Sequence, residues 1–381
     1  MAKLLILNAG SSSVKAAVFD GQQGALARVA SAHVEGIGTT GPADHEEALG
    51  EIIAQVGGTS GAVISAAAHR VVHGGPDFAE PVVVDDHVLS RLDALAPLAP
   101  LHQPHNVAGI RAAMRLFPGA MQIACFDTAF HRAERDDAYA IPRRFYEEGV
   151  RRYGFHGLSY EFVSHRLAEL DPDFAKGRVV IAHLGNGASA CIVKDGRSMG
   201  STMGFSPLDG LIMGTRPGQI DPGVLLWMVE AKGMSGAEIS TVLYRESGLR
   251  ALTGESDMRA LEASGDPEAR RGIERFVERL CREVASLAAL TDGMDGLVFT
   301  GGIGENSVLV RRLAMARLGW LGIVGEEEAN RRGDAVISAP GSPIRVMRIA
   351  TDEEAMIARH AQALLRGRDG TTQKGAVTRL S

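Results

Sequence analysis

A chain of 381 residues is long for a single hydrophobic core, so about two domains are expected. Its composition, with 45% hydrophobic and 23% charged residues, is ordinary for a globular protein. The net charge of −6, from 46 acidic and 40 basic residues, argues against a nucleic-acid-binding surface but leaves room for a local phosphate site.

The apolar runs of the chain are short. Only four consecutive apolar residues precede Asn8, too few for a signal peptide, and no run approaches the roughly 18 residues of a membrane span. Cys125, Cys191 and Cys281 have no paired or metal-type spacing, which predicts buried, reduced thiols. We therefore expect a cytoplasmic protein with neither a membrane nor a nucleic-acid partner.

The first predicted element is a β-hairpin at residues 4–21. Two apolar runs flank a corner of small residues, and the second run ends at the turn pair Asp20-Gly21. Gly10 permits a sharp bend, while Ser11 and Ser13 supply backbone N–H and hydroxyl donors. Such a corner suits an anion, commonly phosphate, but a simple polar turn explains this stretch equally well.

Strands alternate with helices in the following segment, as in an α/β domain. Residues 143–157, rich in Arg, Glu, Gly and aromatic side chains, then indicate a domain junction near Val150. The predicted strands cover residues 26–35, 62–72 and 121–126, and the predicted helices cover 44–56, 91–96 and 105–117.

Residues 179–196 repeat the pattern of the first hairpin without a gap. Gly185 aligns with Gly10, His183 with Asn8, and a second Asp-Gly pair ends the repeat. Internal repetition indicates a duplicated unit. Two such hairpins could hold a polyphosphate between them.

The remainder of the chain is mainly helical. A strand at 297–300 leads into the Gly-rich corner 301–306, and the tail 366–381 is polar and without periodicity, which predicts a mobile segment. The other predicted strands are 197–204 and 345–349, and the predicted helices are 223–232, 235–245, 256–264, 267–293 and 351–365.

Two arginines lie in glycine-rich contexts. Arg70 ends an apolar strand, and Arg216 lies in a loop rich in Gly and Pro. Each, taken singly, is more often a surface salt bridge. Beside two phosphate-type hairpins, however, both become candidates for binding a phosphoryl group, because guanidinium pairs bidentately with such oxygens.

Four further residues are candidates with structural alternatives. Asp127 ends a buried strand, where ligand sites of α/β proteins lie, but it can also cap the next turn. His156 and His183 can donate to phosphoryl oxygen, although a single histidine is usually structural. Glu353 can bind Mg²⁺ or can belong to a helix N-terminus whose capping box is Thr351-x-x-Glu354.

The Gly-rich corner at residues 301–306 invites a dinucleotide-binding interpretation. It lacks the third glycine of that motif, since Ser307 stands there, so the match is weak. Its strand–corner–helix setting still suits close approach to a nucleoside. The chain contains no P-loop motif.

Together these stretches resemble the acetate kinase family, within the acetate and sugar kinase/Hsp70/actin superfamily. The resemblance extends from residue 3 to about 360. The motifs that carry it are Asn8-Ala-Gly-Ser-Ser-Ser-Val-Lys15, His69-Arg-Val-Val-His-Gly-Gly75, Phe126-Asp-Thr-Ala-Phe-His131, Tyr153-Gly-Phe-His-Gly157, His183-Leu-Gly-Asn-Gly-Ala-Ser189, Met203-Gly-Phe-Ser-Pro-Leu208, Met213-Gly-Thr-Arg216 and Gly301-Gly-Ile-Gly-Glu-Asn306.

The resemblance implies an α/β fold of two duplicated actin-like (ribonuclease H-like) domains with a nucleotide cleft between them. Residues 1–150 would form the N-terminal domain, joined by a C-terminal helix at about 352–365. Residues 151–351 would form the domain for nucleotide binding and homodimerisation. The implied reaction is reversible transfer of a phosphoryl group from ATP to acetate, with Mg²⁺ or Mn²⁺, giving acetyl phosphate and ADP.

The resemblance also implies roles for individual residues. Asp127, Arg70, Arg216 and His156 would be catalytic, and Asn8 and Glu353 would serve the metal. Arg70, Val72, Leu101, Phe155 and Pro207 would bind the acetate, the last four as an apolar pocket for its methyl group. The expected ATP-binding residues are Lys15, Ser11, Ser13, His183, Leu184, Gly185, Asn186, Gly187, Asp257, Met258, Arg259, Gly301, Gly302, Ile303, Gly304 and Glu305.

The chain departs from the family pattern at a few positions. Asp352 stands in place of the usual Asn, Tyr160 in place of a histidine, and Leu158 in place of a small or polar residue. Pro217 follows Arg216 where Ser is usual, and Gln219 replaces Asp. The acid preference is therefore an open point.

Other functions remain open on the sequence alone. A propionate or butyrate kinase differs by only one or two methylene groups, each worth about 1–3 kcal/mol of discrimination. A non-catalytic nucleotide switch of the actin or Hsp70 kind would use the same hairpins without a role for the two arginines. A sugar kinase would need Asp127 as a base for a hydroxyl group. Because a carboxylate needs no deprotonation, an acetate kinase would use Asp127 to orient an arginine or the metal shell.

Overall fold

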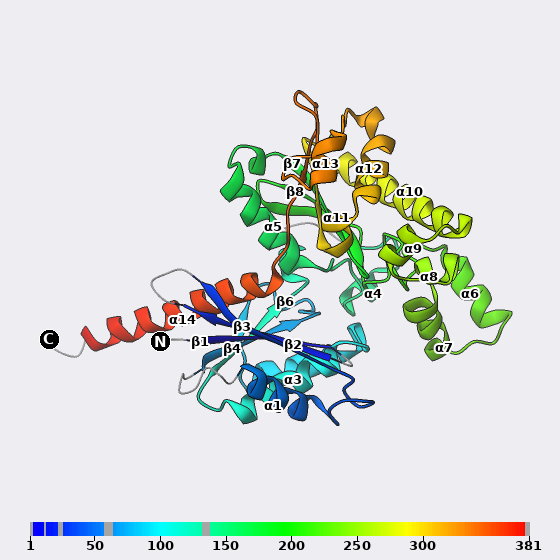
Figure 1. The fold of residues 1–381 in the computed structure, drawn as a ribbon. Helices are drawn as coiled ribbons and strands as arrows, with labels where there is room; N and C mark the ends of the chain where they lie inside the picture. The colour runs from blue at the N-terminus through cyan, green and yellow to red at the C-terminus, as the bar shows by residue number, and fades with distance from the viewer. Residues whose placement is uncertain (1–2, 11–12, 22–25, 57–63, 132–137, 378–381) are drawn as a thin grey trace. The chain divides into compact units, whose positions relative to one another are not determined.

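The computed structural model describes residues 3–10, 13–21, 26–56, 64–131 and 138–377, with the backbone alone for 368–377. The chain forms two compact units, Met1–Ala129 with Asp352–Ser381, and Phe130–Thr351. Each unit is built around one β-sheet (Figure 1). No helix of the described part is long and apolar enough to cross a membrane.

The first unit contains a six-stranded mixed sheet. Strand β1 (Lys3–Ala9) pairs antiparallel with β2 (Ser13–Asp20) and parallel with β4 (Ile64–Val71). The ends of the sheet are β3 (Ala27–Glu35) on one side and β6 (Met121–Phe126) with β5 (Val82–Val83) on the other. The order is β3-β2-β1-β4-β6-β5.

Helices cover both faces of this first sheet. Helices α1 (His45–Val56) and α3 (Gln103–Leu116) pack on the face that carries Leu5 and Leu7. Helix α14 (Glu353–Val377) packs against β1, β4 and β6, and Figure 1 shows it on the opposite side of the strands from α1 and α3. Helix α2 (Asp86–Ala94) packs against α3.

The second unit repeats this arrangement. Its sheet has the order β11-β10-β7-β8-β9, with β7 antiparallel to β8 and parallel to β10, just as β1 is to β2 and β4. The predicted α/β fold with a duplicated unit is therefore confirmed. The bounds are β7 (Arg178–Leu184), β8 (Ala188–Lys194), β9 (Arg197–Ser201), β10 (Gly296–Thr300) and β11 (Arg345–Arg348).

Helices are the main secondary structure of the second unit. Helix α5 (Gly157–Leu170) packs on β7, and the long α10 (Pro267–Ala289) contacts β7, β8 and α12. The remaining helices are α4 (Arg143–Glu147), α6 (Pro222–Glu230), α7 (Gly236–Thr241), α8 (Gly248–Thr253), α9 (Met258–Ala263), α11 (Gly301–Asn306), α12 (Val308–Arg317) and α13 (Glu327–Arg332).

The two hairpins differ by one residue at the corner. Ala9 pairs with Val14, which leaves four residues in the first corner, whereas Leu184 pairs with Ala188, which leaves three in the second. The ungapped alignment therefore holds for the first strand of each hairpin and is displaced by one residue in the second strand. Asn8 faces Lys15 across its hairpin, and His183 faces Ser189.

Residues 130–150 group with the second unit, although the sequence placed the junction near Val150. His131 Nε2 donates to the Phe155 carbonyl, and Ala138 forms a β-bridge with Arg151. These contacts tie the segment to residues after 150. Helix α14 also continues to Val377, beyond its predicted end at residue 365, because the loss of hydrophobic periodicity does not by itself end a helix and the segment contains no proline.

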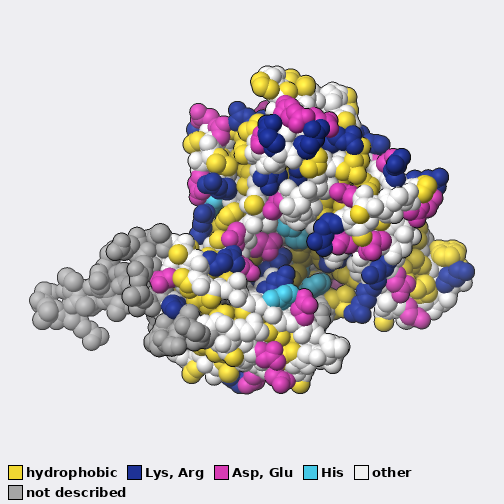
Figure 2. All heavy atoms as spheres, viewed as in Figure 1, with side chains coloured by type: hydrophobic (Ala, Val, Ile, Leu, Met, Phe, Trp, Pro, Cys, Tyr) yellow, Lys and Arg dark blue, Asp and Glu magenta, His cyan; other side chains and the backbone are white. Residues whose placement is uncertain are grey.

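The surface and the cysteines agree with the composition. Figure 2 shows Lys and Arg side chains interspersed with Asp and Glu over the visible face, without a large region of one sign. Cys125, Cys191 and Cys281 are buried free thiols. Burial raises the pKa of Cys191 to about 12, so this thiol is unreactive.

Candidate active site

One cluster of candidate residues lies on a single face of the first sheet. Leu5, Leu7, Val14 and Ala16 face α1 and α3. Since side chains alternate along a strand, Asn8 and Lys15 face the other way, and they pair directly across the hairpin. Arg70, three residues after the core residue Ala67 of β4, also belongs to the face that α14 covers.

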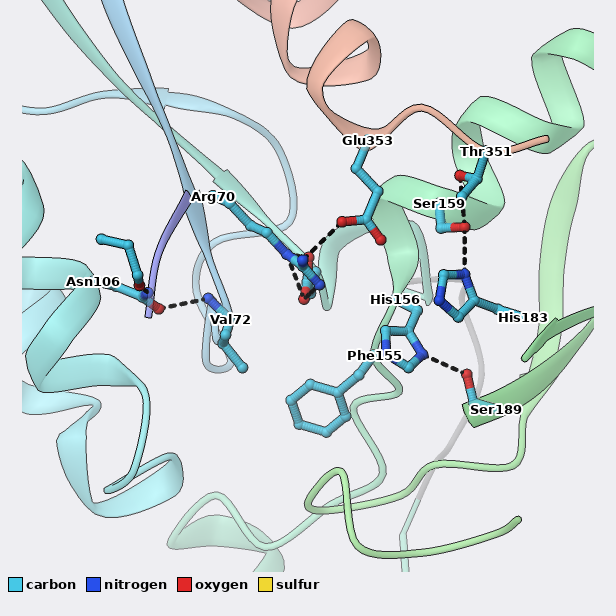
Figure 3. A network of polar contacts seen from close by, with 12 residues as sticks. Arg70, Val72, Asn106, Phe155, His156, Ser159, His183, Ser189, Thr351 and Glu353 are labelled. Atoms are coloured by element: carbon cyan, nitrogen blue, oxygen red, sulfur yellow. Dashed lines mark hydrogen bonds and ion pairs between the residues drawn. The ribbon is translucent and has the colours of Figure 1, made fainter. Parts of the chain in front are cut away.

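Arg70 bridges two carboxylates within the first unit. Its Nε and Nη2 donate to Asp127 Oδ1 and Oδ2 at 2.9 and 2.7 Å, and its Nη1 lies 2.7 Å from Glu353 Oε2 (Figure 3). The side chains of Arg70, Asp127 and Glu353 are 18%, 3% and 17% exposed. Burial disfavours the guanidinium charge, but the two carboxylates outweigh it and raise the pKa of Arg70.

The backbone fixes both carboxylates of this cluster. The Asp127 N–H donates to the Val71 carbonyl, so Asp127 continues the pairing of β6 with β4. Glu353 begins α14. The alternative capping box at Thr351 is wrong, because Asp352 Oδ1 accepts from the Ala355 N–H and Glu354 pairs with Arg28. Glu353 is thus directed to Arg70 rather than to its own helix terminus.

Asn106 is a buried residue of this region that the sequence did not single out. Its side chain accepts from the Val72 N–H at 3.0 Å and donates to the Ala9 carbonyl at 2.7 Å (Figure 3). It therefore holds the end of β1 to the residue after β4. The sequence signal that could have identified Asn106 is its position as a polar residue on the apolar face of the predicted helix 105–117. Leu101, the other predicted methyl-pocket residue of this unit, is half-buried.

The second unit contains a pair of histidines at the end of β7. His156 precedes α5 with φ of 57°, a left-handed conformation that costs energy for a residue other than glycine. Its ring stacks on that of His183 with centroids 4.4 Å apart. His156 Nδ1 lies 2.9 Å from Ser189 Oγ, and His183 Nδ1 lies 2.8 Å from Ser159 Oγ, which also contacts Thr351 (Figure 3).

Arg216 lies at the same corner. A Cβ added to Gly187 would lie 3.4 Å from His156 Nε2 and 3.8 Å from Arg216 Nη1, so both side chains approach this glycine. Arg216 donates to the Pro207 carbonyl at 3.3 Å, and its guanidinium carbon lies 5.8 Å from the centre of the Tyr244 ring. Among the described residues it has no carboxylate within ion-pair distance, and burial lowers the pKa of Arg216.

The predicted nucleotide segments adjoin one another within the second unit. A Cβ on Gly301 would lie 2.8 Å from the Leu184 carbonyl, so the corners after β10 and β7 touch. A Cβ on Gly214 would meet both Asn186 Oδ1 and the Ser256 carbonyl, which places residues 257–259 beside the β7 corner. Glu305 Oε1 accepts from the N–H groups of Gly301 and Thr351.

A buried cation supports the Gly301 corner and was missed by the sequence. Arg311 is 1% exposed, and its Nη1 donates to the carbonyls of Gly304 and Glu305 at 2.9 and 2.8 Å. These are carbonyls in the last turn of α11, where a positive charge is favourable. Arg311 lies five residues after the motif at 301–306, so its support of the Gly301 corner can be seen only in the folded structure.

The predicted site residues thus divide between the two units. Asn8, Lys15, Arg70, Val72, Leu101, Asp127 and Glu353 belong to the first, and His156, His183, Phe155, Pro207 and Arg216 to the second. Ser13 lies at the first corner, where its carbonyl accepts from the Gly10 N–H. Ser11 lies outside the described residues.

Two units of one topology, each with a strand–turn–strand corner beside charged side chains, define the actin-like class of α/β proteins. Within that class the chain belongs to the acetokinase family, whose model matches residues 3–359.

Individual relatives match over nearly their whole length. An acetate kinase of Nitrobacter hamburgensis is 49% identical over 397 residues, covering 98% of each chain. An acetate kinase of Methylocella silvestris is 50% identical over 394 residues, covering 95% of this chain and 98% of the relative.

Two solved structures share the fold closely. A propionate kinase from Francisella tularensis has a TM-score of 0.88 and 36% identity, and the match covers 94% of this chain and 99% of that one. Porphyromonas gingivalis acetate kinase has a TM-score of 0.86 and 35% identity, with 96% and 100% covered.

Proposed function

We propose that this protein catalyses the reversible transfer of the γ-phosphoryl group of ATP to acetate, forming acetyl phosphate and ADP. Family membership and relatives near 50% identity that are named acetate kinases support this activity. The observation in the site that carries it is Arg216, a partly buried guanidinium without a carboxylate partner among the described residues. Such a charge attracts an anion.

Arg216 and His156 are the groups of the second unit suited to the transferring phosphoryl group. Both approach Gly187 at the corner after β7. Phosphoryl transfer spreads negative charge over the equatorial oxygens of the phosphoryl group, and fixed cations and N–H donors stabilise that charge. The Pro207 carbonyl accepts from Arg216, which ties this residue of the predicted methyl pocket to the same cation.

The acceptor needs no base in this reaction. A carboxylate oxygen of acetate attacks the γ-phosphorus, and the bond from that phosphorus to the bridging β,γ oxygen breaks to release ADP. No proton is transferred in this step. Both oxygens of Asp127 accept from Arg70, which supports an orienting role for Asp127 and argues against the general base that a hydroxyl acceptor would require.

The first unit suits a divalent cation. Arg70 supplies one positive charge to two carboxylates, so the cluster keeps an excess negative charge. Glu353 is partly exposed, and Asn8 offers an amide oxygen on the same face of the sheet. Mg²⁺ typically takes one or two protein carboxylates together with nucleotide phosphates and water, which this donor set fits; Mn²⁺ has similar preferences. The metal, when bound, would neutralise charge on the phosphates.

The nucleotide is assigned to the adjoining corners of the second unit. Residues 183–187, 257–259 and 301–305 lie close together there, with glycines at the points of nearest approach. In the first unit, Lys15 and Ser13 of the first hairpin are proposed as phosphate ligands. Lys15 is exposed, and an ammonium group and a serine hydroxyl are donors of the kind that phosphate requires.

The resemblance also implies a homodimer through the second unit, and α6 supports that part of the proposal. None of its residues is buried, and Leu226, Trp227 and Val229 are 59%, 52% and 51% exposed. An apolar helix face of this kind is typical of a surface covered by another copy. Light scattering should give twice the chain mass, and Trp227→Asp should lower it toward one chain; a wild-type monomer would exclude the dimer.

The activity is tested with purified full-length protein, ATP and Mg²⁺, with hydroxylamine to trap acyl phosphate. Acetate, propionate, butyrate, glucose and glycerol are compared through kcat/KM. Acetyl phosphate formation with acetate as the best acceptor is expected. A preference for propionate is the specific alternative that the Francisella tularensis structure raises. ATP binding without any acyl phosphate would indicate a nucleotide switch and reject the proposal.

A further inference from the structure

A chain of three polar groups ends at His156 in the second unit. Tyr160 of α5 and Ser189 of β8 are both fully buried. Ser189 Oγ contacts the Tyr160 hydroxyl on one side and lies 2.9 Å from His156 Nδ1 on the other. The serine hydroxyl therefore connects a buried phenol to a ring nitrogen of a proposed catalytic histidine.

The burial of Tyr160 sets the direction of these hydrogen bonds. Burial raises the pKa of Tyr160 well above its ordinary value, so the phenol keeps its hydrogen. Among the described residues, Ser189 Oγ is the only partner of the Tyr160 hydroxyl, so that hydrogen is donated to the serine. The serine hydrogen is then left for His156 Nδ1. The opposite direction would leave the phenol hydrogen in the interior without an acceptor, which is unfavourable.

The surroundings hold Tyr160 and His156 in this geometry. The Tyr160 ring contacts Phe130 and His131, with centroids 6.5 and 5.5 Å apart. His131 does not compete for the phenol hydrogen, because its Nε2 donates to the Phe155 carbonyl and its Nδ1 contacts Ser198 Oγ. That same carbonyl bond fixes the residue preceding His156.

We propose that Tyr160, acting through Ser189, is a positioning residue that holds the ring proton of neutral His156 on Nε2. Because Nδ1 accepts from Ser189, the neutral ring carries its proton on the nitrogen that faces the Gly187 corner. An Nε2–H group is the form that can donate to a phosphoryl oxygen there. The catalytic importance of that proton rests on the proposed function. The tautomer of His156 does not depend on it.

Tyr160 is one of the positions at which the chain departs from the usual family pattern. A phenol supplies a single hydroxyl hydrogen, whereas an imidazole can place its proton on either nitrogen. The hydrogen-bonded chain Tyr160–Ser189–His156, called the relay below, therefore depends on the tyrosine that this chain has at position 160. Ser189 lies within the motif that ends the second hairpin corner. Its contacts with Tyr160 and His156 give it a second role, in orienting the His156 ring.

The direct test is the tautomer of His156 by nitrogen-15 NMR on the full-length protein labelled at histidine, at a pH where the ring is neutral. His156→Asn identifies the signals. The wild-type ring is expected to show a protonated Nε2 and an accepting Nδ1. Tyr160→Phe frees Ser189 Oγ to accept, so part of the population should move its proton to Nδ1. Ser189→Ala removes the relay at its centre and should have the same effect.

The matched control is Tyr153→Phe. Tyr153 is also buried in this unit, and its hydroxyl donates to the Gly149 carbonyl rather than to the relay. Its loss removes a buried phenol hydroxyl of the same kind and should leave the His156 signals unchanged. A proton on Nδ1 in the wild type, or unaltered His156 signals in both Tyr160→Phe and Ser189→Ala, would overturn the inference.

Kinetics separate this inference from the proposed function. In the Ser-His-Asp triad, a variant that fixes the histidine in the wrong tautomer loses about 10⁴ in kcat. The His156 ring of Tyr160→Phe still samples the correct tautomer, so the loss should be smaller. We expect Tyr160→Phe to lower kcat roughly tenfold. KM for acetate and ATP should change less than about twofold, because binding contacts are intact. Equal losses in kcat for Tyr160→Phe and Tyr153→Phe contradict the relay. Failure of the wild type to form acyl phosphate contradicts the function while the tautomer stays measurable.

Discussion

Arg70 and Arg216 have the same proposed ligand class but opposite electrostatic settings. Arg70 is paired with Asp127 and Glu353, whereas Arg216 has no carboxylate partner among the described residues. We compare Arg70→Met and Arg216→Met, since methionine keeps an apolar stem of similar length. Both should lose about 10³–10⁵ in kcat/KM, or about 4–7 kcal/mol of transition-state stabilisation, by analogy with removal of an arginine finger.

The two variants should differ in stability. Arg70→Met leaves the 3%-exposed Asp127 carboxylate without its cation, which costs about 3–5 kcal/mol. For units of this size that lowers Tm by roughly 6–20 °C. Arg216→Met gives up a long hydrogen bond to the Pro207 carbonyl and a contact with the Tyr244 ring, each worth about 1 kcal/mol, and a weak hydrogen bond to Met213 Sδ. It also removes a partly buried charge that lacks a carboxylate partner among the described residues, so the unfolding free energy should change by no more than about 1 kcal/mol.

The assay measures trapped acetyl phosphate and thermal melting by circular dichroism on the same preparations. Loss of activity at an unchanged melting temperature is expected for Arg216→Met, and loss of both is expected for Arg70→Met. The reasoning is refuted if Arg216→Met melts as early as Arg70→Met, because its charge would then be compensated. It is equally refuted if Arg216→Met keeps more than about a tenth of wild-type kcat/KM.

Two further predictions concern buried groups. Burial lowers the pKa of His69 from 6.5 to about 4, so the unfolded chain binds the extra proton first as pH falls. Stability should therefore drop between pH 6.5 and 4 by about 3 kcal/mol for this residue, and His69→Asn should flatten that slope in urea titrations. Arg311→Met should raise KM for ATP at least about tenfold with little change in KM for acetate, because it frees the Gly304 and Glu305 carbonyls; equal changes in both constants would exclude a local effect.

Local pattern was sufficient to predict every strand except the two-residue β5, and most helices. Both hairpins have short apolar runs ended by turn residues, and β1 and β7 match in length because the same pattern recurs at a fixed separation. Helix α2 begins earlier than predicted, at Asp86, since Asp85 accepts from the Val88 N–H and caps it. Helix α5 was not predicted, because the periodicity of its apolar residues is weak and two of its buried residues are serines, Ser159 and Ser164.

The site was predictable only as far as its motifs extend. Arg70, Asp127 and His156 lie within recognised stretches, but the bonds that join Arg70 to Asp127 and Glu353 link residues 57 and 283 positions apart, and sequence spacing says nothing of such contacts. Asn106, Arg311 and Tyr160 act through buried hydrogen bonds, which depend on the folded backbone.

The one-residue difference between the two hairpin corners has an evolutionary consequence. At equivalent positions opposite the sixth residue of β1 and β7, one hairpin carries Lys15 and the other carries Ser189. A duplicated ancestor would have had two like halves, yet the reaction has one donor and one acceptor. Under the proposed function, the two hairpins therefore have different uses, since Lys15 supplies charge and Ser189 holds a proton in place. A difference of one residue in corner length is enough to bring a different side chain to the same place.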